Sequence, residues 1–219
     1  MDVDGQRRAA GERAAAFVED GMVIGFGSGR GATAALEALA RRNLRVRGVP
    51  TSEKTAEICR RLGLEMVSLD HHPRLDLVID GADEVDPQRQ LIKGGGGAHV
   101  REKLVALASR QRIIVVEEAK LVPRLGVTRG VPIEVLAFGW AGTLARISAL
   151  LPGAARREGP PSDNGGIIVD APLPASADLR TIDRALKGVA GVVDHGLFLD
   201  LAPTVVVGGV SGVRVLSGG

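Results

Sequence analysis

The stretch GMVIGFGSGRGATAALEALARR, residues 21–42, decides the fold of this chain of 219 residues. It begins with an apolar run at 22–26 that is typical of a buried strand, and it then passes through closely spaced glycines. It continues into 33–42, where Ala34, Leu36 and Leu39 form an inward helical face. A short buried strand that leads through glycines into a helix predicts alternating strand–helix units around a mainly parallel sheet.

The same alternation continues as far as residue 116. An earlier helix carries Ala10, Ala14, Phe17 and Val18 on one face, and Ser52 is the expected N-cap of a helix that Gly63 ends. In the later helix, 99–110, we place Val100, Leu104, Leu107 and Ala108 inward, which turns Glu102 away from the core. The other predicted strands are 46–49, 65–69, 75–80, 90–93 and 112–116. The fold class is therefore α/β, with a doubly wound sheet.

After Leu125 the pattern changes to that of a small α+β domain of split βαβ type. Three antiparallel strands are expected at 132–136, 165–170 and 196–201, with helices at 141–151 and 179–186 between them. The strand-rich tail at 204–216 is expected to return to the first sheet. The sequence therefore predicts one domain from 1–127 plus 203–219, and a smaller one from 128–202.

Composition excludes several classes of protein. The 28 Lys and Arg residues exceed the 26 Asp and Glu residues by a net charge of only +2, which is no nucleic-acid footprint. Four Phe, one Trp and no Tyr leave little aromatic surface for stacking on bases. One cysteine, Cys59, indicates a reducing compartment, and no apolar run approaches the length of a membrane span. We expect a soluble, cytoplasmic protein without nucleic-acid or membrane partners.

Loops that follow parallel strands are where ligands bind, and the first such loop is glycine-rich. Its sequence, GFGSGRGA at 25–32, is suited to converging backbone N–H groups on an anion at a helix N-terminus. Gly27, Gly29 and Ala32 also satisfy a dinucleotide-binding pattern, but the sequence VPTS at 49–52 lacks the acid that a nicotinamide site requires. A phosphate-type ligand is favoured over a dinucleotide or a plain tight turn.

The second candidate loop follows the strand at 75–80, in the sequence LDLVIDGADEVD, residues 75–86. Asp80 and Asp83 are expected to face one crevice, where crowded carboxyl groups have separated pKa values and can shuttle protons. A divalent-metal site is the alternative, although no histidine has useful spacing. Asp83, Glu84 and Asp86 have the further interpretation of a solvated turn.

The third candidate is KGGGG, residues 93–97, directly before the helix that carries Glu102. Four consecutive glycines are costly in conformational entropy, so a backbone reason for them is expected, and they form a second candidate anion nest. Glu102 either overhangs this loop or is an exposed glutamate favoured by the helix dipole.

Five motifs together resemble ribose-5-phosphate isomerase, type A. They are GFGSG (25–29), GVPTSEKT (48–55), DLVIDGADEVD (76–86), LIKGGGGAHVREK (91–103) and SDNGG (162–166). The resemblance implies a Rossmann-like domain with a smaller ferredoxin-like α+β domain, assembled as a homodimer or homotetramer. It also implies interconversion of D-ribose 5-phosphate and D-ribulose 5-phosphate through an enediol(ate) in the non-oxidative pentose phosphate pathway, with no cofactor and no metal.

The resemblance also implies roles for particular residues. Glu102 is the expected general base, Asp80 and Asp83 act in ring opening and on hydroxyl protons, and Lys93 stabilises the enediolate oxygen. The expected substrate-binding residues are Ser28, Gly29, Arg30, Gly31, Gly81, Ala82, Gly94, Gly95, Gly96 and Lys120.

The chain departs from this family at the first loop. Where type A isomerases usually read Thr-Gly-Ser-Thr, this sequence has Ser28-Gly29-Arg30-Gly31, and Ala119 stands where serine is common. Arg30 either binds phosphate, as guanidinium does well, or points to solvent. Two other classes share the general architecture, a sugar-phosphate sensor and a CoA transferase. A sensor would give no role to Glu102, Asp80 and Asp83, and the roughly 21 residues before the first strand are too few for a DNA-binding module. The DGADE and KGGGG motifs argue against the CoA transferase.

Overall fold

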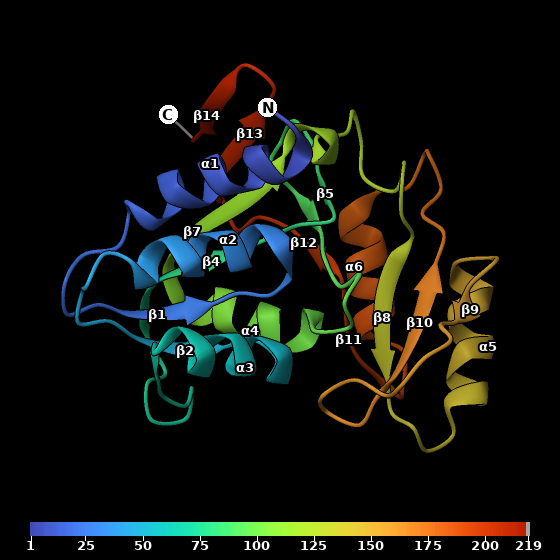
Figure 1. Cartoon of the computed structure of the whole chain (residues 1–219). Coiled ribbons are helices and arrows are strands. Elements are labelled where there is room, and N and C mark those ends of the chain that lie inside the picture. The colour runs from blue at the N-terminus through green and yellow to red at the C-terminus, as the bar shows by residue number, and fades with distance from the viewer. Residues whose placement is uncertain (218–219) are drawn as a thin grey trace. The chain divides into compact units, whose positions relative to one another are not determined.

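The computed structural model describes residues 1–217 (Figure 1). Its largest sheet within these residues has seven strands. Its order is β14-β13-β7-β4-β1-β2-β3, and every neighbouring pair is parallel except β13 and β14. Without the antiparallel edge strand β14, this is the doubly wound order 3-2-1-4-5-6, whose direction of winding reverses between β1 and β4. The strands are β1 Val23–Phe26, β2 Arg47–Pro50, β3 Glu65–Met66, β4 Leu75–Asp80, β7 Ser109–Glu117, β13 Thr204–Gly209 and β14 Gly212–Leu216.

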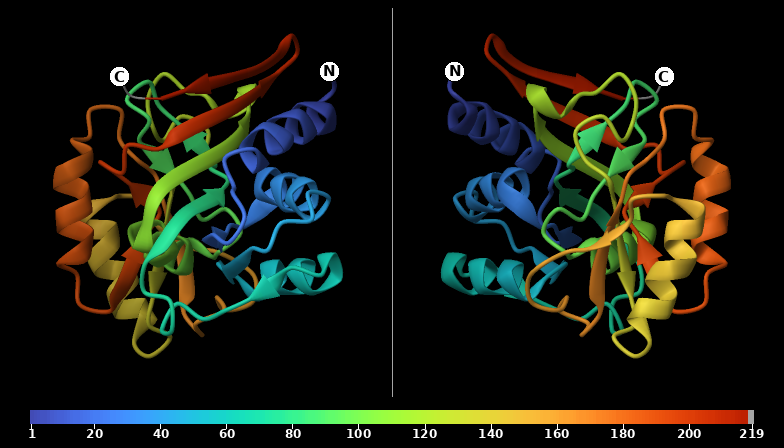
Figure 2. Two further views of the ribbon diagram at one scale, coloured as in Figure 1. Left: turned by 90° about the vertical axis from the view of Figure 1, so that its left-hand side faces the viewer. Right: turned by 90° about the vertical axis from the view of Figure 1, so that its right-hand side faces the viewer.

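Helices cover both faces of this sheet (Figure 2). Alternate strand residues such as Ile24 and Phe26 are buried in one cluster with residues of α1 Val3–Ala15, α2 Gly29–Ala40 and α3 Glu53–Leu62. Gly25 points to the opposite face, where a Cβ would lie 2.4 Å from Cγ1 of Val105 on α4 His99–Ala108. The glycine is required because α4 packs directly on β1 at this point.

The second unit contains a four-stranded antiparallel sheet with order β11-β8-β10-β9. Its chain order is β-α-β-β-α-β, so the strands follow the 4-1-3-2 arrangement of a ferredoxin-like fold. Apolar residues of β8, β10 and both helices form its core, including Ile133, Ile147, Val169 and Leu186. The elements are β8 Val131–Val135, α5 Trp140–Leu150, β9 Ala155–Arg156, β10 Ile167–Ala171, α6 Leu179–Lys187 and β11 Val192–His195.

A small antiparallel sheet, β12-β6-β5, belongs to the same unit. Its strands are β5 Glu84–Val85, β6 Leu91–Ile92 and β12 Leu197–Phe198. The contacts divide the chain into one unit of 1–82, 101–121 and the segment from Leu201 onward, and another of 83–100 and 122–200. Compared with the division expected from the sequence, the segments 83–100 and 122–127 lie in the second unit.

Most elements of the first sheet are where the sequence predicts them, and β4 has the predicted bounds. The tail also returns to the first sheet, as the β13–β14 hairpin beside β7. Ser52 caps α3 by accepting a hydrogen bond from the Thr55 N–H, and Gly63 ends that helix with φ 71°. The first helix, in contrast, ends at Ala15, so Phe17 and Val18 follow it in a turn.

Three predictions about local structure were wrong. The helix expected from residue 33 begins at Gly29, because the glycines of the loop form its first turn. The strand expected at 196–201 is β12 of the small sheet, and β11 occupies its place beside β8. Leu104 and Leu107 are 53% and 59% exposed, whereas Glu102 is 5% exposed, so the prediction for these three residues of α4 was wrong, although Val100 is buried as predicted.

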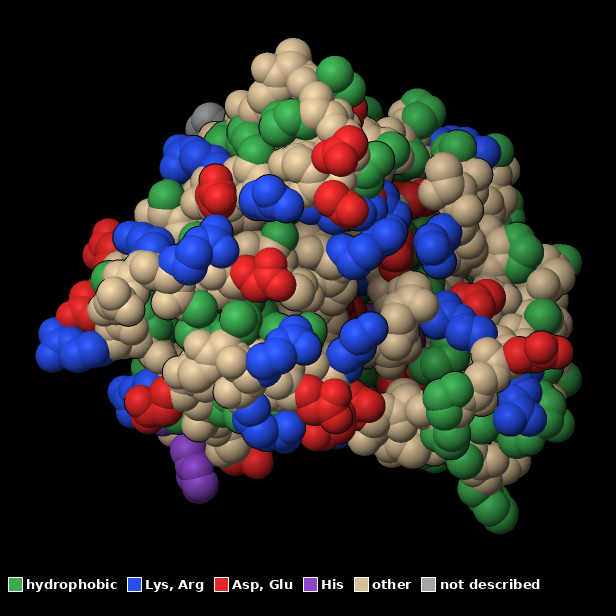
Figure 3. Space-filling model, viewed as in Figure 1, with side chains coloured by type: hydrophobic (Ala, Val, Ile, Leu, Met, Phe, Trp, Pro, Cys, Tyr) green, Lys and Arg blue, Asp and Glu red, His purple; other side chains and the backbone are tan. Residues whose placement is uncertain are grey.

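The surface carries charges of both signs. Figure 3 shows Lys and Arg side chains interspersed with Asp and Glu side chains over the face that it draws, in keeping with the net charge of +2. Within residues 1–217 no helix combines the length and the apolar character needed to cross a membrane.

Candidate active site

The first glycine loop and Asp80 meet where the winding of the large sheet reverses. Asp80 ends β4, is 1% exposed, and its Oδ1 accepts hydrogen bonds from Ser28 N–H at 2.9 Å and Gly81 N–H at 2.8 Å. A Cβ on Gly27 would lie 2.4 Å from the same oxygen. The loop therefore closes directly over this carboxylate, at the edge where doubly wound sheets bind their ligands.

A cluster of hydroxyl groups holds the side chain of Ser28 in the first glycine loop. Ser28 Oγ lies 2.8 Å from Thr51 Oγ1, 2.9 Å from Ser52 Oγ and 3.0 Å from Thr55 Oγ1. Because Ser28 is engaged there, its side chain does not cap α2, although it occupies the N-cap position. The N-terminal N–H groups of α2 are thus without a side-chain cap, and Arg30 in the first turn is exposed.

Sequence reasoning gave no role to Thr51 and Thr55. The signal for them is the sequence TSEKT at 51–55, which places three hydroxyls in five residues directly after a parallel strand. Their burial at 0% and 2% exposure is explained by the hydrogen bonds that they share with Ser28.

Glu102 lies toward the carboxyl end of the same sheet. The helix α4 passes directly into Ser109, which pairs with Leu75 at the start of β4, so the helix runs antiparallel to the strands. Val105 packs against Gly25 in β1, and Glu102 lies one helical turn nearer to the carboxyl ends of the strands. The glutamate is buried, which excludes the interpretation of an exposed glutamate at a helix start.

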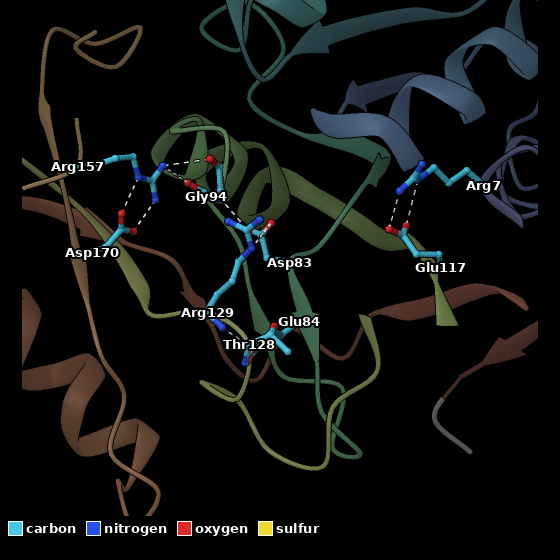
Figure 4. Close-up of polar contacts among 10 residues, drawn as sticks. Arg7, Asp83, Glu84, Gly94, Glu117, Thr128, Arg129, Arg157 and Asp170 are labelled. Carbon is cyan, nitrogen blue, oxygen red and sulfur yellow. Dashed lines mark hydrogen bonds and ion pairs between the residues drawn. The ribbon is translucent and has the colours of Figure 1, made fainter. Parts of the chain in front are cut away.

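Basic residues gather near the end of β7. Arg7 Nη2 lies 2.9 Å from Glu117 Oε1, and both side chains are about a tenth exposed (Figure 4). Burial acts to raise the pKa of the Glu117 carboxyl, but the hydrogen bond from Arg7 and the charges of Arg7 and Lys120 hold that pKa below its usual range. Lys120 is half-buried in the short 3-10 helix η1 Glu118–Lys120. The sequence did not reveal the Arg7–Glu117 pair, because 110 residues separate its members.

Asp83 belongs to the second unit and is held by the second glycine loop. Its Oδ2 accepts a hydrogen bond from Gly95 N–H at 2.7 Å, and its Oδ1 lies 3.8 Å from Arg129 Nε (Figure 4). A Cβ on Gly95 would lie 2.7 Å from Asp83 Oδ1 and 3.1 Å from Arg129 Nη1. A side chain at this position would displace the Asp83 carboxylate or the Arg129 guanidinium.

Glu84 holds the segment that carries Arg129. Its carboxylate, 0% exposed, accepts hydrogen bonds from Gly126 N–H at 2.6 Å, from both Thr128 N–H at 2.5 Å and Thr128 Oγ1 at 2.6 Å, and from Arg129 N–H at 2.9 Å. Burial acts to raise the pKa of Glu84, but these hydrogen bonds together bring it below its usual range. Asp86 is also buried, and burial raises its pKa. The solvated-turn interpretation of Glu84 and Asp86 was therefore wrong.

The second glycine loop begins at Lys93 and continues through the glycines 94–97. Lys93 is 3% exposed, its N–H donates to Gly196 O at 2.9 Å, and its Nζ lies 5.6 Å from the centre of the Phe198 ring. Gly94 has φ 109°, and a Cβ there would lie 2.7 Å from His99 Nδ1, so the position excludes any larger residue.

The SDNGG motif folds over a buried glutamate. Ser162 Oγ donates to Glu134 Oε1 at 2.8 Å and Asn164 Nδ2 donates to the same oxygen at 3.2 Å. A Cβ on Gly166 would lie 2.6 Å from Glu134 Cγ. These contacts give the motif a structural role in fixing the loop before β10.

The predicted site residues fall into two groups. One group belongs to the first unit and comprises Ser28, Gly29, Arg30, Gly31, Asp80, Gly81, Ala82, Glu102 and Lys120. The other belongs to the second unit and comprises Asp83, Lys93, Gly94, Gly95 and Gly96. The chain passes from one unit to the other between Ala82 and Asp83 and again between Val100 and Arg101. Across residues 1–217, His, Cys, Asp and Glu side chains form no group of three that could hold a metal ion.

The fold defines a class of protein: an α/β protein with a doubly wound, mainly parallel sheet and a smaller ferredoxin-like unit. Comparisons with known proteins identify the family. The model of the family described as ribose 5-phosphate isomerase A (phosphoriboisomerase A) matches residues 47–212. The ribose-5-phosphate isomerase A of Caulobacter sp. (strain K31) is 47% identical and covers 97% of this chain and 98% of its own length.

Solved structures agree with this assignment. Ribose 5-phosphate isomerase A from Methanocaldococcus jannaschii is 32% identical with a TM-score of 0.92, over 98% of this chain and 99% of its own. A D-ribose-5-phosphate isomerase in complex with phospho-erythronic acid is 33% identical with a TM-score of 0.94, over 100% of both chains. The chain belongs to the ribose 5-phosphate isomerase A family.

Proposed function

We propose that Glu102 is the general base in the reaction of this family, the interconversion of D-ribose 5-phosphate and D-ribulose 5-phosphate. In this step of the non-oxidative pentose phosphate pathway, a base removes the proton from C2 of the opened aldose and returns it to C1, through an enediol(ate). The observation that carries the assignment is a buried glutamate on the inward face of α4, toward the carboxyl ends of the strands. A glutamate at this place is directed toward the edge where doubly wound sheets bind their ligands.

Asp80 and Asp83 are proposed to move hydroxyl protons during ring opening and between the two oxygens of the enediol. Both carboxylates are fixed by backbone N–H groups: Asp80 by Ser28 and Gly81, and Asp83 by Gly95. A carboxylate held in this way keeps one orientation toward a substrate hydroxyl, which is what a proton-transfer group needs.

Lys93 and the N–H groups of the second glycine loop are proposed to stabilise the negative oxygen of the enediolate. Preorganised donors aimed at a developing oxyanion supply a large part of the rate acceleration in reactions of this kind. The phospho-erythronic acid bound by the similar enzyme supports this proposal, because its carboxylate resembles the two oxygens of an enediolate. The proposed catalytic groups of this chain are therefore one general base, two carboxylates that carry hydroxyl protons, and one site that binds the enediolate oxygen.

The phosphate group is proposed to bind at the first loop. The first turn of α2 offers N–H groups without a side-chain cap, and the positive end of a helix favours an anion. Arg30 lies in this turn. Lys120 lies three residues after the end of β7, and its charge lowers the pKa of Glu117. The substrate-binding residues of this end are then Ser28, Gly29, Arg30, Gly31 and Lys120.

The substitution Glu102→Gln tests the base assignment, because the amide keeps the shape of the side chain and cannot accept the proton. We expect kcat to fall by roughly 10²- to 10⁴-fold with little change in KM, the typical contribution of a general base. Turnover is measured from ribose 5-phosphate to ketose, with Glu57→Gln on the exposed side of α3 as the matched control. A Glu102→Gln enzyme with full turnover removes Glu102 from this role.

The chain is further proposed to form a homodimer or homotetramer in the cytoplasm. Support for self-association comes from large apolar side chains exposed in the second unit, Phe138 at 96%, Leu136 at 56% and Val193 at 43%. The mass in solution, measured by light scattering, decides between these states and a monomer. Support for the reducing compartment comes from Cys59, which is buried and free.

A further inference from the structure

An arginine of the ferredoxin-like sheet grips the second glycine loop by its carbonyl oxygens. Arg157 follows β9, and its Nη1 donates to Gly94 O at 2.9 Å and to Gly95 O at 3.1 Å (Figure 4). Its Nε and Nη2 donate to the two carboxylate oxygens of Asp170 on β10, at 2.7 Å and 2.5 Å. One edge of the guanidinium thus forms a bidentate ion pair with Asp170, and the remaining nitrogen, Nη1, donates to the two carbonyl oxygens of the loop.

Holding a carbonyl also fixes the N–H group on the far side of the same peptide plane. In a trans peptide the C=O and the following N–H point in opposite directions. With Gly94 O turned toward Arg157, the Gly95 N–H points away from it and donates to Asp83 Oδ2 at 2.7 Å. With Gly95 O turned the same way, the Gly96 N–H also points away from Arg157.

Gly96 is the open end of this arrangement. It is exposed, and a Cβ built on it would meet no atom within 4 Å among the described residues. Gly94, in contrast, is enclosed by His99. Arg157 therefore holds the Gly95–Gly96 peptide by its carbonyl oxygen, while the N–H of the same peptide lies on the opposite side, at an exposed residue.

We propose that Arg157, oriented by Asp170, is a positioning residue that sets two N–H groups of the glycine loop for catalysis: Gly95 N–H to hold Asp83, and Gly96 N–H to bind the enediolate oxygen. The proposal rests on the proposed function. It explains how four consecutive glycines, which are otherwise free to sample many conformations, become a preorganised donor site. It also explains the choice of arginine, whose planar fork binds a carboxylate with one edge while it donates from another, as a lysine cannot.

The experiment compares Arg157→Ala with Arg156→Ala. Arg156 is the adjacent arginine, and its guanidinium carbon lies 4.9 Å from the Trp140 ring centre. For Arg157→Ala we expect kcat to fall roughly 10- to 100-fold, somewhat less than the loss of a whole oxyanion donor, while KM stays within about threefold. The inhibition constant of phospho-erythronic acid, used as the enediolate probe, is expected to rise roughly tenfold, and Arg156→Ala to leave all three quantities unchanged.

A second variant and a rescue measurement separate positioning from a general loss of structure. Asp170→Asn keeps the side-chain shape but weakens the hold on Arg157, so kcat is expected to fall in the same direction and by less. Added guanidinium ion at millimolar concentration is expected to restore part of the turnover of Arg157→Ala and none of that of Glu102→Gln. If Arg157→Ala does not fold, Asp170→Asn decides by the same readouts.

The proposal is overturned if folded Arg157→Ala keeps kcat within about twofold of the parent enzyme, or if kcat falls while the affinity for phospho-erythronic acid is unchanged. Failure of the proposed function looks different, because Glu102→Gln then retains turnover whatever Arg157→Ala does.

Discussion

The two glycine loops of this enzyme look alike in sequence and are held by different forces. The first, at 25–31, closes over Asp80 by tight packing: added Cβ atoms on Gly27 and Gly31 would lie 2.4 Å and 2.5 Å from backbone carbonyl oxygens. The second, at 94–97, is held by the charged side chains of Arg157 and Asp83. In both cases an aspartate accepts a hydrogen bond from an N–H group of the loop, Asp80 from Ser28 and Asp83 from Gly95. The first loop is held mainly by packing, and the second mainly by charged side chains.

This difference shows what a run of glycines does and does not specify. In the first loop the missing side chains make room for neighbouring backbone, so the conformation follows from the sheet itself. In the second loop Gly96 has open space around it, and the conformation depends on partners that are distant in sequence. The first loop should therefore be sensitive to added volume at Gly27 and Gly31, whereas the second loop at Gly96 should tolerate a methyl group and respond to lost charge at its partners.

The largest expected effect is that of Gly27→Ala. The new methyl group would meet Asp80 Oδ1 and Ile79 O at 2.4 Å, so we expect the free energy of unfolding to fall by roughly 3 kcal/mol or more. Gly96→Ala is the matched control, with an expected change below about 1 kcal/mol because the methyl group has open space. Urea unfolding followed by circular dichroism measures both. Equal losses in the two variants would contradict the distinction between the loops.

Glu84→Gln tests the electrostatic support of the second unit. We expect a loss of roughly 1–3 kcal/mol at pH 7, because the buried carboxylate accepts four hydrogen bonds from residues 126–129. Since the pKa of Glu84 is lowered on folding, its contribution is complete above its unfolded pKa of about 4.3 and is lost as pH falls through the lower folded pKa. The difference between parent and variant should therefore shrink below about pH 4. A difference that stays constant down to pH 3 would assign the effect to shape alone.

Arg30→Ala concerns the phosphate end of the first loop, where this chain departs from its family. If Arg30 binds phosphate from the exposed first turn of α2, KM for ribose 5-phosphate should rise roughly 5- to 20-fold with kcat nearly unchanged. Steady-state kinetics at low and high salt measures this, and the effect should weaken as salt screens the charge. An unchanged KM at low salt would return Arg30 to a purely solvent-facing role.

The smallest expected effect is at Cys59, on the helix α3 whose Thr55 hydroxyl contacts Ser28 of the first loop. Burial raises the pKa of its thiol to about 11, so almost no thiolate exists at pH 8. We expect no measurable labelling by a disulfide reagent over an hour in the native protein, and complete labelling in urea. Rapid native labelling would show that α3 opens, and that the first loop is less firmly packed than its contacts imply.

The sequence predicted the alternating elements of the large sheet well, because their apolar periodicity and glycine ends are local signals. It failed on α4, where Leu104 and Leu107 are the exposed residues and Glu102 and Lys103 are buried. Apolar periodicity assumes that polar residues face water, and a helix that buries a glutamate and a lysine reverses that assumption. The strand β11 was missed because two of its four residues are only half-buried and one is exposed.

For the candidate site, the family motifs supply the proposed roles of Asp80, Asp83, Lys93 and Glu102, which stay predictions. The supporting residues were not predicted, because their partners are far apart in the chain. Arg157 is 63 residues from Gly94, and Glu84 is 44 residues from Thr128. No local pattern encodes such pairs, whereas the three hydroxyls at 51–55 were visible in the sequence and needed only the position of Ser28 to explain them.

The crossings of the chain at residues 82–83, 100–101, 121–122 and 200–201 have a consequence for how such an enzyme can change. Neither unit is encoded by one continuous stretch, so no single genetic cut can delete, duplicate or transplant one of them. A continuous stretch such as 122–200 lies within the second unit but contains only part of it. Exchange of a whole unit therefore requires several simultaneous cuts, whereas a point change in either unit leaves the course of the chain intact.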